Sequence, residues 1–526
     1  MKIVTKSLLL ATLGSLWFAT AGAESTLADL IQNGSRQAAL ELIAEGADVN
    51  AAQGDGTTPL HWAVYRIDTG LTRSLLDSGA SADTVNQYGS SPLAEAVKVA
   101  HPELVTMLLD AGADPESPNL DGQTALMLAV RSGSLEVARL LVEHGAGVDA
   151  RESWRGQTAL MWAAEGRHPE LTRYLIEHGA NVSARAIAND WGTQITSEPR
   201  AQYRPTGGLT PLLYAARSGC ADCVTAILAG GEDVDRPTPD GVTPLMISID
   251  NYEFDTAALL LDAGANPHLS DWWGRTALHV AVDMNTYVSR EVLGGLRGSG
   301  TDTIPGATHS ARTTGMDIVE RLLAADVDVN TQLNMHRVGR GGNSQRFNDD
   351  LLTTGATPLL RAAITHDHAS MRLLLEHGAH VDLPNVMGVT PLMAAAGIGV
   401  RDSNFGSNRS PRFATDELIE DKVIMSLEIL LAAGAEINAR VTDLHSRTAR
   451  IARLSRMTDR EGQTGLYSAA GRGWTRVVEF MIERGAEVDI VDGVGKSPRD
   501  AALGRLTRGG DVHEQVAEIL VSASGG

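Results

Sequence analysis

The segment GQTALMLAVRSGSLEVARLLVEHGAGVD, residues 122–149, decides the fold of this chain. Thr124 can cap a helix by accepting a hydrogen bond from a free backbone N–H, and apolar residues follow it at helical spacing. Gly133 interrupts that helix, a second apolar stripe follows, and Gly145 can adopt the left-handed conformation that ends a helix. The segment therefore predicts two short antiparallel helices whose apolar face must be buried against further copies of the same unit.

Copies of this unit recur along the chain, most often at intervals of 33 residues. A tetrad like Thr-Pro-Leu-His opens at Thr58, Ser91, Thr124, Thr158, Thr210, Thr243, Thr276, Thr357, Thr390, Thr464 and Ser497. A Gly-Ala stop recurs at Gly46, Gly79, Gly112, Gly145, Gly179, Gly264, Gly378, Gly434 and Gly485. In seven units Pro directly follows the cap, where its missing N–H costs nothing. The repetition predicts an all-α solenoid of stacked helix pairs joined by hairpin-like links.

The unit resembles the ankyrin repeat, whose marks are a 33-residue period carrying Thr-Pro-Leu-His-x-Ala and Gly-Ala-Asp-Val-Asn. Residues 58–90, TPLHWAVYRIDTGLTRSLLDSGASADTVNQYGS, match that pattern closely. The resemblance covers nearly all of the chain from about Ser25. It implies an ankyrin-repeat solenoid over residues 24–526 with about twelve repeats, the eleven tetrads plus an N-terminal cap at about 25–57. It also implies a monomeric scaffold that binds another protein.

Residues 1–23 have the features of a secretory signal peptide. Lys2 and Lys6 form a basic start, residues 7–20 form an apolar run, and small residues precede a cleavage site after Ala23. The run is too short to span a bilayer comfortably, and no later stretch approaches about 20 apolar residues, so we expect no membrane span. We predict export, most simply to a bacterial periplasm or beyond the cell, and the alternative is a buried first helix.

The charge balance and the absence of catalytic motifs exclude several classes of protein. The formal net charge is −21, and it becomes −23 once the two lysines leave with the signal peptide. General nucleic-acid binding requires a basic surface, so this composition argues against it. The chain contains no Gly-x-Ser-x-Gly, HExxH, phosphate-loop or paired zinc-cysteine motif. We therefore expect no catalysis, no metal site and no cofactor.

Five insertions break the 33-residue period. Three of the hairpin links, called fingers in this family, are lengthened by 18 or 19 residues, near 183–207, 331–355 and 439–461. Two loops between the helices of one repeat are lengthened by 29 and 23 residues, near 284–314 and 399–420. A solenoid tolerates such insertions because a loop can leave the stack without disturbing its core.

The three long fingers share an unusual composition. Together they hold twelve Arg, no Lys and seven acidic residues. Arg presents a planar fork that suits carboxylates and phosphates. Arg447, Arg450, Arg453 and Arg456 of the last finger are candidate contacts, and they favour a partner with an acidic contact surface. The alternative is that these loops carry soluble charge and pair with the acidic solenoid.

Aromatic and Arg residues occupy the positions where ankyrin repeats usually contact partners, which are the finger tips and the exposed end of the first helix. The candidates are Tyr65, Arg66, Tyr88, Trp154, Arg155, Trp272, Trp273 and Arg275. Trp, Tyr and Arg dominate the energetics of protein interfaces. We expect them to line the concave face, and the alternative for each is packing against a neighbouring finger.

Cys220 and Cys223 are the only cysteines, and they fall at the start of a second helix, where the regular unit has Ser134 and Val137. An exported chain should oxidise the pair, so we expect a small structural disulfide or buried thiols. In oxidoreductases a C-x-x-C motif at a helix N-terminus also lowers the pKa of a thiol, so a redox role and a metal-binding role remain alternatives for this pair. The second functional hypothesis is therefore a periplasmic enzyme or redox accessory with a loop-built site beside this pair.

Overall fold

The computed structural model describes residues 26–189, 206–294, 312–334, 354–398, 416–442, 461–506 and 511–525, without the side chains of 189, 206, 286–294 and 416–418. The expected signal peptide and Arg447, Arg450, Arg453 and Arg456 lie outside the described residues. By its contacts the chain divides into two compact units, residues 1–147 and 148–526. We call them unit 1 and unit 2.

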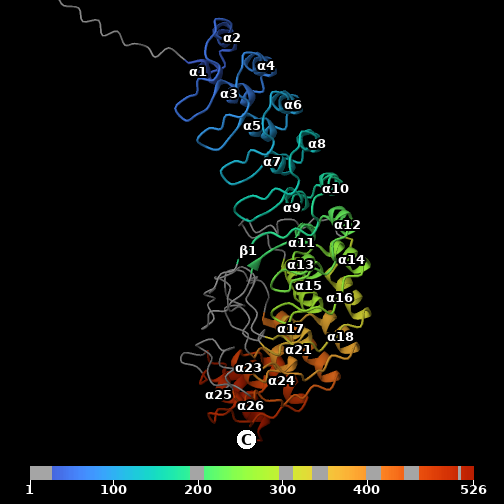
Figure 1. Ribbon diagram of the computed structural model, residues 1–526. Coiled ribbons are helices and arrows are strands. Elements are labelled where there is room, and N and C mark those ends of the chain that lie inside the picture. Colours follow the sequence, from blue (N-terminus) through green and yellow to red (C-terminus); the bar gives the residue numbers. More distant parts are fainter. Residues whose placement is uncertain are drawn as a thin grey trace, which may run out of the picture. The chain divides into compact units, whose positions relative to one another are not determined.

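Unit 1 consists of helix pairs in chain order (Figure 1). Its helices are α1 (Leu27–Gln32), α2 (Arg36–Ala44), α3 (Pro59–Tyr65), α4 (Thr69–Asp77), α5 (Pro92–Lys98), α6 (Pro102–Asp110), α7 (Ala125–Arg131) and α8 (Leu135–Glu143). The first helix of each pair packs against its own second helix and against the first helix of the next repeat. The links between pairs form the fingers. Within the unit each repeat therefore contacts its neighbours in sequence.

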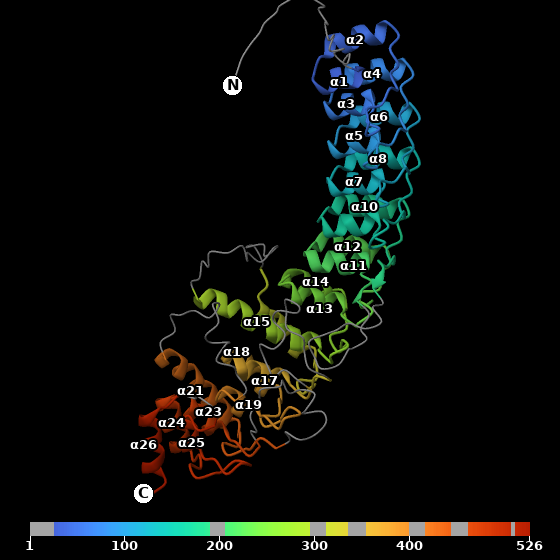
Figure 2. The ribbon, with the colours of Figure 1, turned by 90° about the vertical axis from the view of Figure 1, so that its left-hand side faces the viewer.

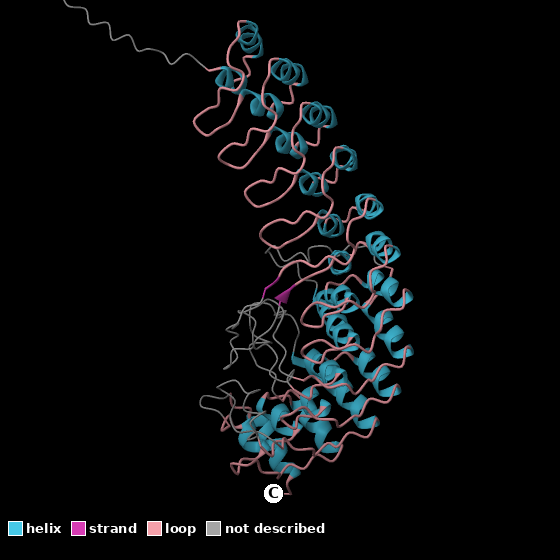
Figure 3. Ribbon diagram, viewed as in Figure 1, coloured by secondary structure: helices cyan, strands magenta, loops and turns pink. Residues whose placement is uncertain are grey.

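Unit 2 continues the same pairing (Figure 2). Its helices are α9 (Ala159–Glu165), α10 (Pro169–Glu177), α11 (Pro211–Ser218), α12 (Ala221–Ala229), α13 (Pro244–Asp250), α14 (Phe254–Asp262), α15 (Ala277–Gly294), α16 (Gly315–Ala324), α17 (Pro358–Thr365), α18 (His368–Glu376), α19 (Pro391–Ala395), α21 (Asp416–Ala432), α23 (Gly465–Gly471), α24 (Thr475–Glu483), α25 (Pro498–Ala502) and α26 (Glu514–Ala523). Strands β1 (Ala188–Asn189) and β2 (Thr206–Gly207) pair antiparallel at the base of the first long finger (Figure 3). In the described parts of both units together, twelve helix pairs are present.

The tetrads begin first helices for the predicted reason. Thr124 caps α7, because its Oγ1 accepts a hydrogen bond from the backbone N–H of Met127 at 3.4 Å. Leu126 and Val130 of α7 and Leu141 of α8 have no exposed surface, so the predicted stripes form the core. Capping and burial both depend on residues close in sequence, which is why the helices were predictable.

Left-handed residues close both ends of the second helix. Gly145 takes φ 94° directly after α8, as predicted, and Asp326 takes φ 58° at the corresponding position after α16. The turn between the helices of a repeat needs a second left-handed residue, and Gly133 supplies it with φ 75°. Ile67 adopts the same conformation with φ 56°, although a β-branched side chain is strained there.

The last residue of the Gly-Ala-Asp-Val-Asn motif ties one repeat to the next. In unit 1 the Asn50 Oδ1 accepts the backbone N–H of Ser81 at 2.8 Å, and its Nδ2 donates to the carbonyl of Gly79 at 3.0 Å. In unit 2 Asp149 accepts the backbone N–H of Asn181 at 2.9 Å. The motif therefore satisfies backbone groups that the end of a short second helix leaves free.

Two of the expected enlarged loops are shorter than predicted. Helix α15 continues to Gly294, so the first part of the loop expected near 284–314 is helical. Helix α21 begins at Asp416, inside the loop expected near 399–420. Extending a helix satisfies backbone hydrogen bonds that an open loop would leave to water, and spacing between motifs does not distinguish the two. Among the described helices, none combines the length and apolarity that crossing a membrane requires.

Candidate partner-binding surface

A buried or half-buried polar side chain holds the finger in several repeats. The Asn86 Oδ1 accepts the backbone N–H groups of Tyr88 and Ser90, each at 3.0 Å. The Asp271 Oδ1 accepts those of Trp273 and Arg275 at 3.0 and 2.9 Å. Asn119, Glu152, Asn385 and Asp492 act in the same way. Sequence reasoning missed these residues, although an Asn or Asp five residues before the tetrad was a usable signal for all of them except Glu152, which stands six residues before Thr158.

Neighbouring fingers are also joined by backbone hydrogen bonds. In unit 1 the N–H of Gln87 donates to the carbonyl of Asp55 at 2.9 Å. In unit 2 the N–H of Ile187 donates to Arg155 at 2.7 Å, and that of Trp272 donates to Asp240 at 2.9 Å. Hydrogen bonds within each finger and between neighbouring fingers fix the finger backbone, so the side chains at the finger tips project from a rigid support.

Unit 1 presents two of the predicted aromatic residues to solvent. Tyr65, at the end of α3, is 60% exposed, and Tyr88, on a finger, is 65% exposed. The Tyr65 ring meets Trp62 edge to face at 5.7 Å between centroids. Trp62 is half-buried, and its Nε1 donates to Gln53 at 2.8 Å. Arg66 follows directly and is exposed. These side chains place one apolar and one cationic contact side by side.

Unit 2 presents Trp154 and Trp272 on its fingers. Trp154 is 79% exposed, and the guanidinium of Arg155 lies 5.6 Å from its ring centroid. Trp272 is 42% exposed. A cation beside an aromatic face is favourable, so Arg155 helps to hold Trp154 in its exposed position.

Trp273 and Arg275 are not surface contacts, which corrects the prediction from sequence. Each is 7% exposed. The Nε of Arg275 pairs with Asp271 at 2.6 Å, its Nη1 approaches Asp250 at 3.4 Å, and its guanidinium stacks on Trp273 at 5.4 Å. Burial by itself lowers the pKa of Arg275, but Asp250 and Asp271 outweigh it and raise that pKa. Trp273 and Arg275 therefore stabilise the finger from inside and are not exposed for contact with a partner protein.

Other Arg side chains of unit 2 also bind their own chain. Arg217 pairs with Glu165 of the preceding first helix at 2.8 Å, and Arg361 pairs with Asp283 at 2.6 Å. Arg185, from the first long finger, donates to two backbone carbonyls at 2.6 and 2.9 Å. Of these three residues only Arg185 belongs to a long finger, and it bonds to backbone carbonyls and not to acidic side chains.

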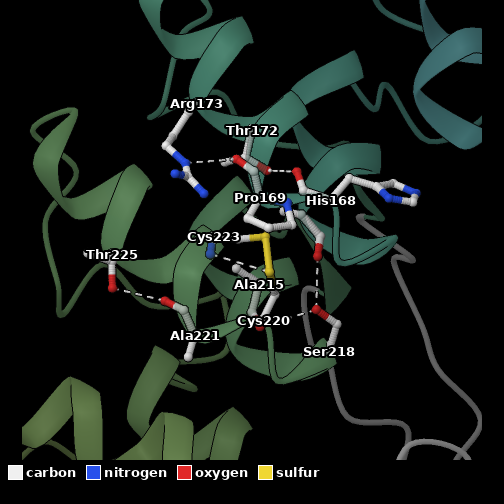
Figure 4. Close-up of a disulfide and its surroundings, with 11 residues drawn as sticks. His168, Pro169, Thr172, Arg173, Ala215, Ser218, Cys220, Ala221, Cys223 and Thr225 are labelled. Carbon is white, nitrogen blue, oxygen red and sulfur yellow. Dashed lines mark hydrogen bonds between the residues drawn. A yellow bond between two sulfur atoms is a disulfide. The ribbon is translucent and has the colours of Figure 1, made fainter. Parts of the chain in front are cut away.

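Cys220 and Cys223 form a disulfide at the start of α12 (Figure 4). Cys220 is 6% exposed and Cys223 has no exposed surface. The Sγ of Cys220 lies 3.3 Å from the backbone N–H of Cys223, so it occupies the capping place that Ser134 takes in α8.

Four polar side chains drawn around the disulfide, those of Thr172, Arg173, Ser218 and Thr225, donate hydrogen bonds to backbone carbonyls and not to sulfur. Thr172 donates to His168 at 2.9 Å, and Ser218 donates to Ala164 at 2.9 Å (Figure 4). Within the described residues, no group of three His, Cys, Asp or Glu could hold a metal ion. This arrangement gives no support to the redox alternative.

The comparisons with known proteins point to one family. A sequence model of ankyrin repeats in three copies matches residues 27–119, 100–186, 194–271 and 212–304, more than half of the chain. A model of the single ankyrin repeat matches residues 354–386.

Individual relatives are similar over parts of the chain. The B-cell lymphoma 3 protein homolog of Mus musculus is 31% identical over 200 residues, 37% of this chain and 42% of the relative. The putative ankyrin repeat protein YahD of Escherichia coli (strain K12) is 28% identical over 204 residues, 35% of this chain and 87% of the relative. The human ASB11 ankyrin repeat domain is 22% identical, with a TM-score of 0.37 over 46% of this chain and 98% of that one. The chain thus spans less than half the length of the mouse relative.

Proposed function

Because the chain belongs to the ankyrin-repeat family, whose repeats are protein–protein interaction scaffolds, we propose that it is an exported, non-catalytic scaffold for another protein. The proposed binding surface is the face formed by the first helices and the fingers, which the family resemblance identifies as the concave face. Each unit has such a face of its own.

The exposure of large aromatic side chains on this face carries the proposal. Tyr65, Tyr88 and Trp154 keep 60%, 65% and 79% of their surface in water. A buried Trp removes about 150–250 Å² from water, which favours association by several kcal/mol before the costs of binding are subtracted. Tyr and Trp are also the side chains most often found to dominate binding energy.

Two features support export. Residues 1–23 combine a basic start, an apolar run and a small-residue cleavage site. The disulfide between Cys220 and Cys223 suits an oxidising compartment, where such bonds persist. We propose the periplasm of a bacterium, or the cell exterior, as the site of action.

The partner's contact surface is proposed to be acidic. Arg447, Arg450, Arg453 and Arg456 of the last long finger support this by composition alone, since they lie outside the described residues. Arg forms charge-assisted, bidentate hydrogen bonds with carboxylates.

Site-specific photocrosslinking in the producing cell tests the proposal. A photoreactive phenylalanine replaces Tyr65 or Trp154 in the full chain, and the controls carry it at Arg139 of α8 or Arg173 of α10, both exposed on second helices. We expect a protein adduct at Tyr65 or Trp154 and none at the controls. Equal labelling at all four positions, or none at any, would overturn the binding surface.

Fractionation of the same cells tests export. The full chain should appear in the periplasmic or extracellular fraction with Glu24 at its N-terminus. A protein that retains Met1 and stays in the cytoplasm would overturn export while leaving the binding proposal standing.

A further inference from the structure

Three successive repeats of unit 1 each expose a basic residue at the end of the first helix. The residues seven and eight positions after the start of each tetrad are Tyr65-Arg66, Lys98-Val99 and Arg131-Ser132, and all six are exposed. Ile67, which follows Arg66, is 46% exposed. We call these seven residues the first-helix strip. Because α3 packs on α5 and α5 packs on α7, the strip runs across the repeats instead of along one helix.

The strip is cationic in an otherwise acidic unit. Residues 26–147 contain sixteen acidic and six basic residues, and Arg66, Lys98 and Arg131 are half of the basic ones. The strip itself contains no acidic residue. Lys98 lies 3.0 Å from Glu95 of its own helix, and its side chain is still 42% exposed. The strip therefore concentrates positive charge where an incoming anionic group can reach it.

The corresponding positions of unit 2 carry acidic residues in three repeats and Arg217, Arg472 and Arg505 in three others. They include Glu165, Asp250 and Asp283, each of which meets an Arg of the same unit within 3.4 Å. The same position in the repeat thus serves internal ion pairs in unit 2. In unit 1 no acidic residue occupies it in the second, third or fourth repeat.

The strip also offers apolar surface that is held in place. Tyr65 is supported by its edge-to-face contact with Trp62. Arg66 is fixed by a hydrogen bond from its Nη1 to the carbonyl of Gln32 at 3.2 Å and by lying over Gly34, where a Cβ would come within 2.7 Å of its Nη2. Binding to a side chain that is already ordered loses less conformational entropy.

Ile67 adds a second apolar contact at a structural cost. Its φ of 56° is in the left-handed region, where Gly34 and Gly133 lie at the same position of other repeats. A β-branched residue is strained there, and nearly half of its surface gains nothing from packing. A ligand that covers Ile67 would recover that apolar area.

We propose that the first-helix strip binds an extended acidic segment of the partner. Its carboxylates meet Arg66, Lys98 and Arg131, and its apolar side chains lie on Tyr65, Ile67 and Val99. Packed helices are about 8–10 Å apart. An extended chain in the polyproline II conformation rises about 3.1 Å per residue with three residues per turn, so carboxylates at every third residue lie on one side and match the repeat spacing. This inference rests on the proposed function and names the chemistry of the partner at that surface.

Fluorescence anisotropy with defined peptides tests the inference on the mature full chain. The probe is a rhodamine-labelled (Ser-Leu-Glu)₃ peptide. One comparison peptide has Lys in place of Glu, one has Ser in place of Leu, and one has the three Glu adjacent. We expect the probe to bind more tightly than each comparison peptide, and its affinity to fall as salt is raised.

A pair of charge-matched variants tests the location. Arg66→Gln/Lys98→Gln/Arg131→Gln removes the strip's three charges, whereas Arg36→Gln/Arg73→Gln/Arg139→Gln removes the three other basic charges of residues 26–147. Exposed ion pairs are worth about 0.2–1 kcal/mol each, so we expect the first variant to weaken probe binding about tenfold and the second by less than about twofold. Circular dichroism should be the same for both.

Equal weakening by both variants would show a long-range effect of net charge and overturn the strip as the site. Equal affinity for the Glu and Lys peptides, or no binding of any peptide, would overturn the acidic class. If photocrosslinks still form at Tyr65 in that case, the proposed scaffold function is retained, and only the proposal that the partner segment is acidic is rejected. Peptide binding without any cellular adduct would instead overturn the proposed scaffold surface and leave the affinity of the strip for acidic segments standing.

Discussion

Replacing Asp271 by Ala tests how the fingers of unit 2 are held. The Oδ1 of Asp271 accepts the backbone N–H groups of Trp273 and Arg275 at 3.0 and 2.9 Å, and its Oδ2 pairs with the Arg275 Nε at 2.6 Å. The Asp271 side chain has no exposed surface, and that of Arg275 is 9% exposed. The finger also carries Trp272, a candidate partner contact.

The expected magnitude follows from these contacts. Asp271→Ala leaves two backbone donors without their acceptor and leaves Arg275 with Asp250 alone. Breaking a buried ion pair lowers stability by about 3–5 kcal/mol. The same carboxylate of Asp271 makes the ion pair and accepts the backbone hydrogen bonds, so we expect Asp271→Ala to lower the stability of the finger by that amount in total. Asp271→Asn keeps the backbone acceptor, as Asn86 does in unit 1, so its cost should be about 2 kcal/mol.

Hydrogen exchange measured by mass spectrometry is the suitable assay, because long repeat arrays do not unfold in one step. A loss of about 1.4 kcal/mol speeds exchange through local opening about tenfold. Asp271→Ala should therefore speed exchange in peptides covering 266–276 by more than about 100-fold, and Asp271→Asn by about 30-fold.

Asn86→Ala is the matched control, because Asn86 holds Tyr88 and Ser90 in the same way without an Arg partner. It should cost about 1–3 kcal/mol in its own finger. If Asp271→Asn is as damaging as Asp271→Ala, the ion pair and not the backbone acceptor holds the finger. Exchange within about threefold of the unmodified protein in Asp271→Ala would refute the reasoning altogether.

Three further predictions concern other residues. Trp154→Ala should weaken partner binding by about 2–4 kcal/mol, seen as a higher Kd by calorimetry with an unchanged melting temperature. Cys223→Ala should lower the melting temperature only slightly and leave binding unchanged, because its disulfide closes a very small loop; loss of an activity at unchanged folding would favour redox work instead. Burial lowers the pKa of His61, whose Nε2 donates to the carbonyl of Ser90 at 2.9 Å. Below about pH 6.5 the His61 imidazole takes up a proton in the unfolded chain more readily than in the folded chain. The free energy of unfolding of unit 1 should therefore fall by up to about 1.4 kcal/mol per pH unit below that value. His61→Gln should reduce this pH dependence, measured by hydrogen exchange at several pH values.

The tetrads and the Gly-Ala stops were sufficient to predict the helix pairs and the family. A cap such as Thr124 bonds three residues away, and a stripe such as that of α8 buries one face of a single helix. Both depend on residues a few positions apart, so a 33-residue unit contains them completely. The chain also contains a signal for the finger-holding residues in Asn86 and Asp271, five positions before their tetrads.

The exposure of individual side chains depended on the tertiary structure. Trp272 and Trp273 are adjacent and lie on one finger, yet one is 42% and the other 7% exposed. The difference arises because Asp271 turns the backbone and Arg275 covers Trp273. Likewise, Arg361 meets Asp283 only after two consecutive repeats, separated by long insertions, stack together. Helices form from local hydrogen bonds that the sequence records directly, whereas burial and ion pairing depend on which distant residues the stack brings into contact.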